Sequence, residues 1–443
     1  MEYLNFPTPQ EISLNIIKGN LKFALRLIED WLSKKTPYEL KLKLIYEKER
    51  IKRLPHVFYV SEKKAFENAN KNIRGFTRED FYEVLEKNKC DYVLIEGRKK
   101  FEKRFYYNIS FAFKKYKNNI KISEERILAK KLLEKRLERL IAGEPPKIYK
   151  IRAKISLKVK KTSGDKVRVW LPFPKKGLEI VNVKLISSSH KNFYISPNSF
   201  PQRTIYFEGR DDDNFFVEFE YIIKEWINKV DPSKVNESDI KDFINEEPPH
   251  IVFSNHLKKM TKEIVGKEKN PYMVAKKIYD FITLNVNYSY VRPYMFYDNI
   301  SEYVASNFKG DCGFQAILFI TMLRIAGVPA RWQSGWFITP YFASPHDWAL
   351  FYIKPYGWLP ADLSFGGARR SKEEFRKFYF GNLDGFRMVA NDDFMKDFKP
   401  AKKFFRSDPC DNQIGEVENK EKNIYDFNYR IKIISFKNIM EAI

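Results

Sequence analysis

Two consecutive prolines, Pro145 and Pro146, separate parts of the chain that have different hydrophobic periodicities. Before them, apolar residues recur at helical spacing, most clearly in the segment 123–143 (SEERILAKKLLEKRLERLIAG). After them, apolar and polar residues alternate, as in 149–161 (YKIRAKISLKVKK). One regular element cannot follow a 3.6-residue and a two-residue period together, so a helical part must precede a β-rich part.

Signals for helix starts recur through the first part of the chain. Two Thr-Pro-x-Glu segments, 8–11 and 36–39, each combine a capping threonine, a proline at the first helical position and a glutamate that closes a capping box. Ser61 and Thr77 open further helices. We therefore predict a helical domain over residues 1–146.

Three more regions follow the helical domain. About six short strands separated by turn residues predict a small β-sandwich over residues 147–227. After a polar linker, an amphipathic helix behind Asn270-Pro271 opens a third region, 240–395. The tail, 396–443, contains two predicted strands whose domain the sequence does not identify. The predicted fold class is multidomain α+β.

Composition excludes several classes of protein. With 44% hydrophobic residues in 443, the chain can bury more than one core. It has no apolar run of the ~18 residues that a membrane span needs and no apparent signal peptide, so we expect a cytoplasmic protein without membrane attachment. The three cysteines, Cys90, Cys312 and Cys410, are widely spaced and form no CxxC pair, which argues against a disulfide framework and a zinc site.

The net charge of +23 raises the question of an anionic partner. Lysine and glutamate are intermixed, which is typical of a solvated helical surface, and we find no nucleic-acid-binding motif. We therefore expect that nucleic acid is not the partner of this protein.

Of the three cysteines, Cys312 has a position in the sequence that suggests a reactive thiol. It follows Gly310-Asp311 at the start of a predicted helix that is apolar nearly throughout and that stops at Gly327. A helix start stabilises a thiolate and can lower a thiol pKa from its usual ~8.5. The alternative interpretation is a small buried cysteine with a structural role.

Downstream, a predicted strand–turn–strand places a histidine and a carboxylate at one end of a hairpin. His346 begins an apolar strand, residues 355–357 make a turn, and Asp362 ends the returning strand. A thiol, an imidazole and an orienting acid are the groups that nucleophilic acyl transfer needs. Asp347 is the competing acid, but as the next residue on the strand its side chain should face away from His346.

At these residues the sequence resembles the transglutaminase-like superfamily. The resemblance rests on 275–288 (AKKIYDFITLNVNY), 309–331 (KGDCGFQAILFITMLRIAGVPAR) and 346–365 (HDWALFYIKPYGWLPADLSF). It implies a papain-like α+β core with Cys312 as nucleophile, His346 as base and Asp362 as its orienter. The backbone N–H of Cys312 would be one oxyanion donor, and no metal or cofactor is required. Asp347 departs from the family, which often has a small residue there.

Three functions agree with these residues. The first is a cysteine hydrolase that acts on peptide or other amide bonds, with a protein or peptide as substrate. The second is a transglutaminase, in which an amine rather than water takes the acyl group from the thioester. The third is an inactive binding or scaffold protein with the same fold. The sequence does not indicate the oligomeric state.

Overall fold

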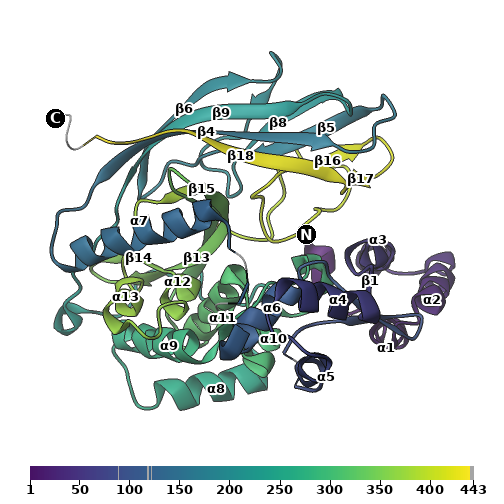
Figure 1. Ribbon diagram of the computed structural model, residues 1–443, viewed down its shortest axis with the longest axis horizontal. Helices are drawn as coiled ribbons and strands as arrows, with labels where there is room; N and C mark the ends of the chain where they lie inside the picture. The colour runs from purple at the N-terminus through teal and green to yellow at the C-terminus, as the bar shows by residue number, and fades with distance from the viewer. Residues whose placement is uncertain (88, 117–118, 121, 440–443) are drawn as a thin grey trace.

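A computed structural model of the chain describes residues 1–87, 89–116, 119–120 and 122–439. A β-sandwich lies across an α+β core, and the helices of the first part lie beside that core (Figure 1). Within the described residues, no helix is both long and apolar enough to cross a membrane. The multidomain α+β class is confirmed.

The first part of the chain is helical with one small sheet. Its helices are α1 (Gln10–Lys18), α2 (Leu21–Ser33), α3 (Tyr38–Val57), α4 (Glu62–Asn72), α5 (Arg78–Glu86), α6 (Phe105–Ala112) and α7 (Glu124–Ile141). The sheet has the order β1-β3-β2, from β1 (Val60–Ser61), β3 (Arg98–Phe101) and β2 (Val93–Ile95). The periodicity of the sequence did not predict these short strands, because strands of two to four residues are too short to alternate visibly.

The predicted helix starts are partly confirmed. The Ser61 side chain accepts from the Lys64 backbone N–H and caps α4, and Thr77 forms a capping box with Asp80 at α5. In α1 and α3 the prolines stand at the N-cap itself, one position earlier in the helix than predicted, and no side chain caps either helix. A proline has no N–H to satisfy, so it is tolerated at this boundary.

The β-sandwich consists of two antiparallel sheets. One has the order β17-β16-β5-β8-β7 and the other β18-β4-β9-β6. The strands are β4 (Ile148–Val159), β5 (Lys166–Pro172), β6 (Ile180–Ser188), β7 (Tyr194–Ile195), β8 (Thr204–Arg210), β9 (Phe215–Lys224), β16 (Glu416–Asn419), β17 (Asn423–Ile424) and β18 (Phe427–Asn438). Buried and less buried residues alternate along β4 and β9, as the period of two predicts for strands with one face in a core.

The C-terminal strands belong to the sandwich. β16 pairs with β5, and β18 pairs with β4 along nearly its whole length. The sequence left the attachment of residues 396–443 open, and this pairing answers it for the part that the structure describes. Positions 440–443 of that range lie outside the described residues. The other predicted domain limits, 1–146, 147–227 and 240–395, stay predictions.

The α+β core surrounds a four-stranded antiparallel sheet of order β14-β13-β12-β15. Its elements are α8 (Asn255–Val265), α9 (Pro271–Asn285), β10 (Asn287–Tyr288), α10 (Ile300–Asn307), β11 (Lys309–Gly310), α11 (Cys312–Ile325), β12 (Ala330–Ile338), β13 (Ala343–Ile353), β14 (Gly357–Ala361), α12 (Leu363–Gly367), α13 (Glu373–Phe378) and β15 (Arg387–Asn391). α11 is buried along its whole length except at Ile325, as its apolar sequence predicts.

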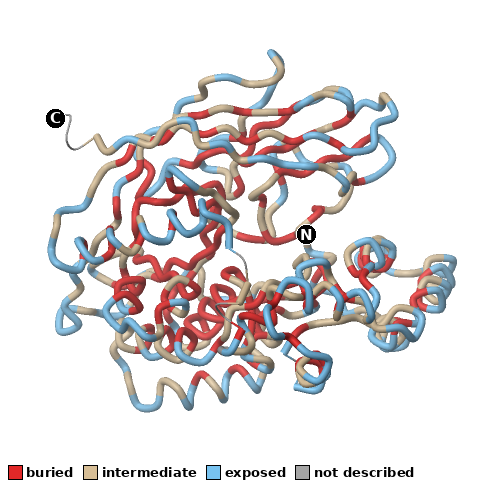
Figure 2. Tube along the Cα trace, viewed as in Figure 1, coloured by how far each residue is buried: buried red, intermediate tan, exposed pale blue. Residues whose placement is uncertain are grey.

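Helix α7 packs differently from the helices before it. Its residues Leu133 and Leu137 are buried in the same apolar cluster as the sandwich and the α+β core, whereas α1 to α6 form two smaller clusters. Arg136 on α7 also pairs with buried Glu225, with Nε to Oε1 at 2.8 Å. Figure 2 shows the buried trace concentrated in the core and along the strands of the sandwich. α7 therefore lies with the core, a grouping that helical periodicity alone cannot predict.

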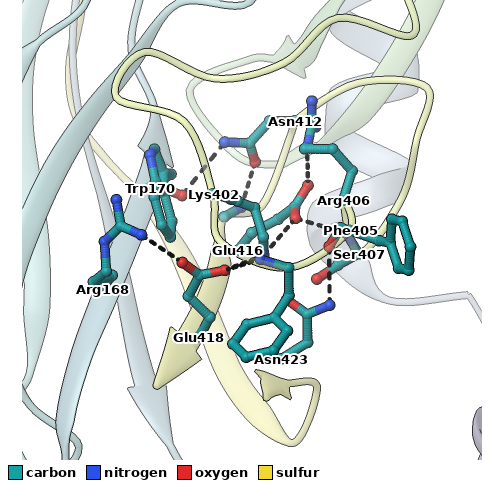
Figure 3. Close-up of polar contacts among 12 residues, drawn as sticks. Arg168, Trp170, Lys402, Phe405, Arg406, Ser407, Asn412, Glu416, Glu418 and Asn423 are labelled. Carbon is teal, nitrogen blue, oxygen red and sulfur yellow. Dashed lines mark hydrogen bonds and ion pairs between the residues drawn. The ribbon is translucent and has the colours of Figure 1, made fainter. Parts of the chain in front are cut away.

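A buried ionic network fastens the segment before β16 onto the sandwich (Figure 3). Glu416 accepts from Arg406 Nε at 2.6 Å and from the Ser407 backbone N–H at 2.7 Å, and it lies 3.0 Å from Lys402 Nζ. Burial alone would raise the pKa of Glu416, but the two cations outweigh it and lower the pKa to about 2. Trp170 on β5 donates to the Pro400 carbonyl at 2.8 Å.

Arg406→Leu is expected to lower the free energy of unfolding by ~3 kcal/mol, because removal of one partner leaves buried Glu416 with less compensation. Chemical denaturation would measure this loss. Arg210→Leu is the matched control, since Arg210 pairs with Asp212 at 3.3 Å on the exposed surface and should contribute less than ~1 kcal/mol. Equal losses for both variants would show that the network does not stabilise the fold.

Candidate active site

Asp311 fixes the start of the helix that carries the candidate nucleophile. Its carboxylate accepts from the Phe314 backbone N–H at 3.1 Å and from the Tyr294 hydroxyl at 2.8 Å. Cys312 is therefore the first residue of α11, as predicted, and Gly327 just beyond the helix has the positive φ of a helix stop. Burial raises the pKa of Asp311 to about 6, although both hydrogen bonds oppose the shift.

Gly313 lets neighbouring elements approach the helix start closely. A Cβ atom at this position would lie 2.1 Å from the Tyr294 hydroxyl, 2.6 Å from the Trp332 ring and 3.0 Å from Asp347 Oδ2. A larger residue would therefore push apart the groups that surround the Cys312 thiol. The Cys312 side chain is closed in, with 8% of the residue exposed.

The hairpin of β13 and β14 forms as predicted and joins the candidate base to its acid. Ala349 pairs with Ala361, and His346 Nε2 lies 2.6 Å from Asp362 Oδ2. The His346 ring packs against Phe365 with ring centroids 4.3 Å apart, and 4% of the residue is exposed. The imidazole is thus held by an acid on one side and an aromatic ring on the other.

Asp362 has two further partners that keep it ionised and in place. Its Oδ1 accepts from the Phe365 backbone N–H at 2.9 Å and so caps α12, and Arg387 Nη2 lies 2.8 Å from Oδ2. Burial alone would raise the pKa of Asp362, but His346 and Arg387 outweigh it and hold the pKa well below its usual range. Arg387 also pairs with Asp384 at 3.0 Å, so the guanidinium has two carboxylate partners.

Asp347 lies on the side of the strand away from the His346–Asp362 contact, as predicted, but its side chain reaches the candidate nucleophile, which was not predicted. The Cys312 thiol donates to Asp347 Oδ2, with Sγ and Oδ2 3.0 Å apart, and Asp347 is buried. Strand alternation does separate Asp347 from the His346–Asp362 pair. It did not indicate that the start of α11 lies against the Asp347 side chain.

The expectation of a lowered thiol pKa is wrong for this structure. Burial, followed by the charges of Asp347 and Asp311, raises the pKa of Cys312 well above its usual value. The helix start favours a thiolate, but removal from water and two nearby carboxylates favour the thiol more strongly.

Two residues of the C-terminal segment that the sequence did not predict reach the site. Gln413 Nε2 donates to the carboxylate of Asp347 and lies 2.8 Å from Asp411 Oδ2. Asp411 also accepts from the Ser334 hydroxyl. No recognisable motif marks Asp411 or Gln413. Their one signal in the sequence is a polar stretch, 407–413 (SDPCDNQ), of which the structure buries several members.

The structure brings the three predicted site residues together in part. His346 and Asp362 are in direct contact, whereas Cys312 contacts Asp347, the residue that follows His346. Among the contacts of the described residues there is no hydrogen bond between Cys312 and His346.

A cysteine at the start of a buried helix that packs beside an antiparallel sheet is the architecture of a papain-like α+β core. Residues 258–363 match the family model described as the transglutaminase-like superfamily. This match supports a cysteine-dependent enzyme in general terms.

The other comparisons give distant similarity. No curated protein matches the sequence. Among solved structures, a candidate cysteine protease from Cytophaga hutchinsonii is 15% identical, with a TM-score of 0.42, over 66% of this chain and 92% of its own. The periplasmic domain of TgpA from Pseudomonas aeruginosa is 11% identical, with a TM-score of 0.29, over 56% of this chain and 96% of its own.

Proposed function

We propose that the core of this chain is a cysteine-dependent hydrolase that cleaves peptide or other amide bonds through a thioester. Cys312 is the nucleophile, His346 the general base, and Asp362 the acid that orients the imidazole. The observation that carries this assignment is the 2.6 Å contact between His346 Nε2 and Asp362. The next residue along the same strand, Asp347, contacts the Cys312 thiol, so the imidazole and the thiol lie in the same site.

In the first half of the reaction the thiol proton moves to the imidazole. Because Asp362 engages Nε2, Nδ1 is the ring atom left to receive that proton. The electron pair that stays on sulfur forms a bond with the acyl carbon. The backbone N–H of Cys312, at the first position of α11, lacks an intrahelical acceptor and can donate to the developing oxyanion.

In the second half the thioester is resolved. The imidazolium returns its proton to the leaving amine as the carbon–nitrogen bond breaks, and a water molecule activated by the same imidazole then attacks the acyl carbon. The carbon–sulfur bond breaks and the thiol is restored. Catalytic hydrogen bonds are often long before substrate binds, so a direct contact between Cys312 and His346 is expected in the substrate complex.

We place this activity in the cytoplasm, with a protein or peptide as substrate. Cys90, Cys312 and Cys410 are all free thiols, which is the state that a reducing compartment maintains.

Incubation of the protein with peptide mixtures, with and without an added primary amine, is expected to produce hydrolysed peptides in both cases. Mass spectrometry distinguishes the products, because hydrolysis adds the mass of water and transfer adds the mass of the amine. Cys312→Ala is the control. A gain of amine mass alone would favour the transglutaminase, and unchanged peptides with an unmodified protein would favour the scaffold.

A further inference from the structure

Asp347 contacts the reacting atom of the proposed mechanism but has no role in that mechanism. Its Oδ2 accepts the thiol proton of Cys312 at 3.0 Å, and 6% of the residue is exposed. The orienting of His346 is already performed by Asp362. Any role of Asp347 in the reaction must therefore act on the Cys312 thiol directly.

Buried Asp347 forms a carboxyl pair with half-buried Asp411. Both carboxylates accept from the single Gln413 Nε2 group, and Asp411 accepts in addition from Ser334. Two carboxyl groups that share one donor, with at least one of them removed from water, resist being ionised together, so the pair tends to retain one proton. Burial, followed by the charge of Asp411, raises the pKa of Asp347 well above its usual value.

The groups around this pair are mostly anions or neutral hydroxyls. They are Asp311 at the start of α11, Tyr288 and Tyr294 on the segment before α10, Ser334 on β12, His346 on β13, and Arg406, Asp408 and Cys410 on the C-terminal segment. Burial raises the pKa of Asp411, and Arg406, which donates to the Asp411 backbone carbonyl at 2.8 Å, opposes that rise without cancelling it. No cation is hydrogen-bonded to the Asp347 carboxylate within the described part of the chain.

We infer that Asp347 is a further catalytic residue, which, with Asp411 as its proton-sharing partner, controls whether the Cys312 thiol can ionise. When Asp347 is ionised, its carboxylate retains the thiol proton and a thiolate beside it is disfavoured. When the pair binds a proton, the negative charge next to sulfur falls. The sulfur–hydrogen bond can then break, with the proton moving to His346 and the electron pair staying on sulfur.

The sign of the pH dependence follows from this coupling and rests on the proposed function. As the pH rises and the pair loses its last proton, the thiolate–imidazolium form loses stability relative to the thiol and neutral imidazole. Reactivity of Cys312 should therefore fall between mildly acidic and mildly alkaline pH, before direct ionisation of the thiol restores it at strongly alkaline pH.

The test measures the rate at which iodoacetamide alkylates Cys312 in the full chain as a function of pH, resolved by peptide mass spectrometry. In the unsubstituted protein the rate should fall as the pH rises. Asp347→Asn should abolish that fall and raise the rate at mildly alkaline pH at least ~10-fold, because one adjacent like charge shifts a pKa by a unit or more. An identical profile, or a slower rate at every pH, would overturn the inference.

Asp411→Asn is a second variant that tests the inference, and it leaves the contact between Asp347 and Cys312 in place. Without its charged neighbour Asp347 should ionise more readily, so the fall in rate should move to lower pH. An unmoved profile in a folded Asp411→Asn protein would contradict the inference. Asp393→Asn is the matched control, because burial raises the pKa of Asp393 to about 6 but its ion-pair partner is Lys396. Its alkylation profile should equal that of the unsubstituted protein.

Alkylation needs no substrate, so this inference and the proposed function can fail separately. A faster Asp347→Asn rate together with no turnover of any acyl substrate would refute the hydrolase and keep the inference. Turnover of a substrate with an unchanged alkylation profile would support the hydrolase and refute the inference.

Discussion

Asp362→Asn is expected to lower turnover by as much as ~10⁴-fold, because an amide in place of the carboxylate favours the wrong imidazole tautomer and no longer stabilises the imidazolium. The fold should survive the substitution. Asparagine can still cap α12, and Arg387 keeps Asp384 as a carboxylate partner at 3.0 Å. A steady-state assay of kcat, with circular dichroism to verify the fold, measures the effect.

Asp384→Asn is the matched control for this prediction. It removes the other carboxylate partner of Arg387 and leaves His346 in contact with Asp362. Stability should fall in the control while kcat changes far less than in Asp362→Asn. If the two variants lost the same activity, the role of Asp362 would be to neutralise Arg387 rather than to orient the imidazole.

Cys312→Ala is expected to abolish covalent capture of an acyl group, since no other atom of the site can form the thioester. Intact-protein mass spectrometry after incubation with an activated acyl ester would detect the adduct in the unsubstituted protein. The free energy of unfolding should change by no more than ~1 to 2 kcal/mol, because few buried contacts are lost. Asp347, the partner of the thiol, keeps its contact with Gln413.

Cys410→Ala is the control for acyl capture, because Cys410 is also a buried free cysteine and lies on the segment that reaches the site. Burial raises the pKa of the Cys410 thiol well above its usual value as well. Adduct formation should persist in this variant. If the adduct were lost in Cys410→Ala and retained in Cys312→Ala, the nucleophile would be Cys410 and not Cys312.

The contacts that could be predicted from the sequence are the local ones. The contact between His346 and Asp362, which are sixteen positions apart, follows from a hairpin in which alternation and a turn determine which side chains meet. The start of α11 at Cys312 follows from Asp311 and the apolar run behind it. In both cases chain geometry alone decides the outcome.

The contacts that could not be predicted join distant parts of the chain. Gln413 lies 66 residues beyond Asp347 in the sequence, and no periodicity encodes which loop will cover a helix start. The contact between Asp347 and Cys312 was missed for the same reason, since strand alternation describes one strand and not the helix that packs against it. The thiol pKa was wrong because it depends on burial and on these long-range carboxylates.

The connection of the C-terminal strands to the sandwich also sets the order in which the site can be completed during synthesis. A chain emerges from the ribosome from its N-terminus, and its domains fold as they appear. Cys312, His346 and Asp362 are all made before Asp411 and Gln413, and β16 and β18, which fasten the Asp411–Gln413 segment to the sandwich, are made later still. A nascent chain therefore carries its nucleophile without the carboxyl pair, and the proton control that we infer begins only when β16 and β18 have joined their sheets.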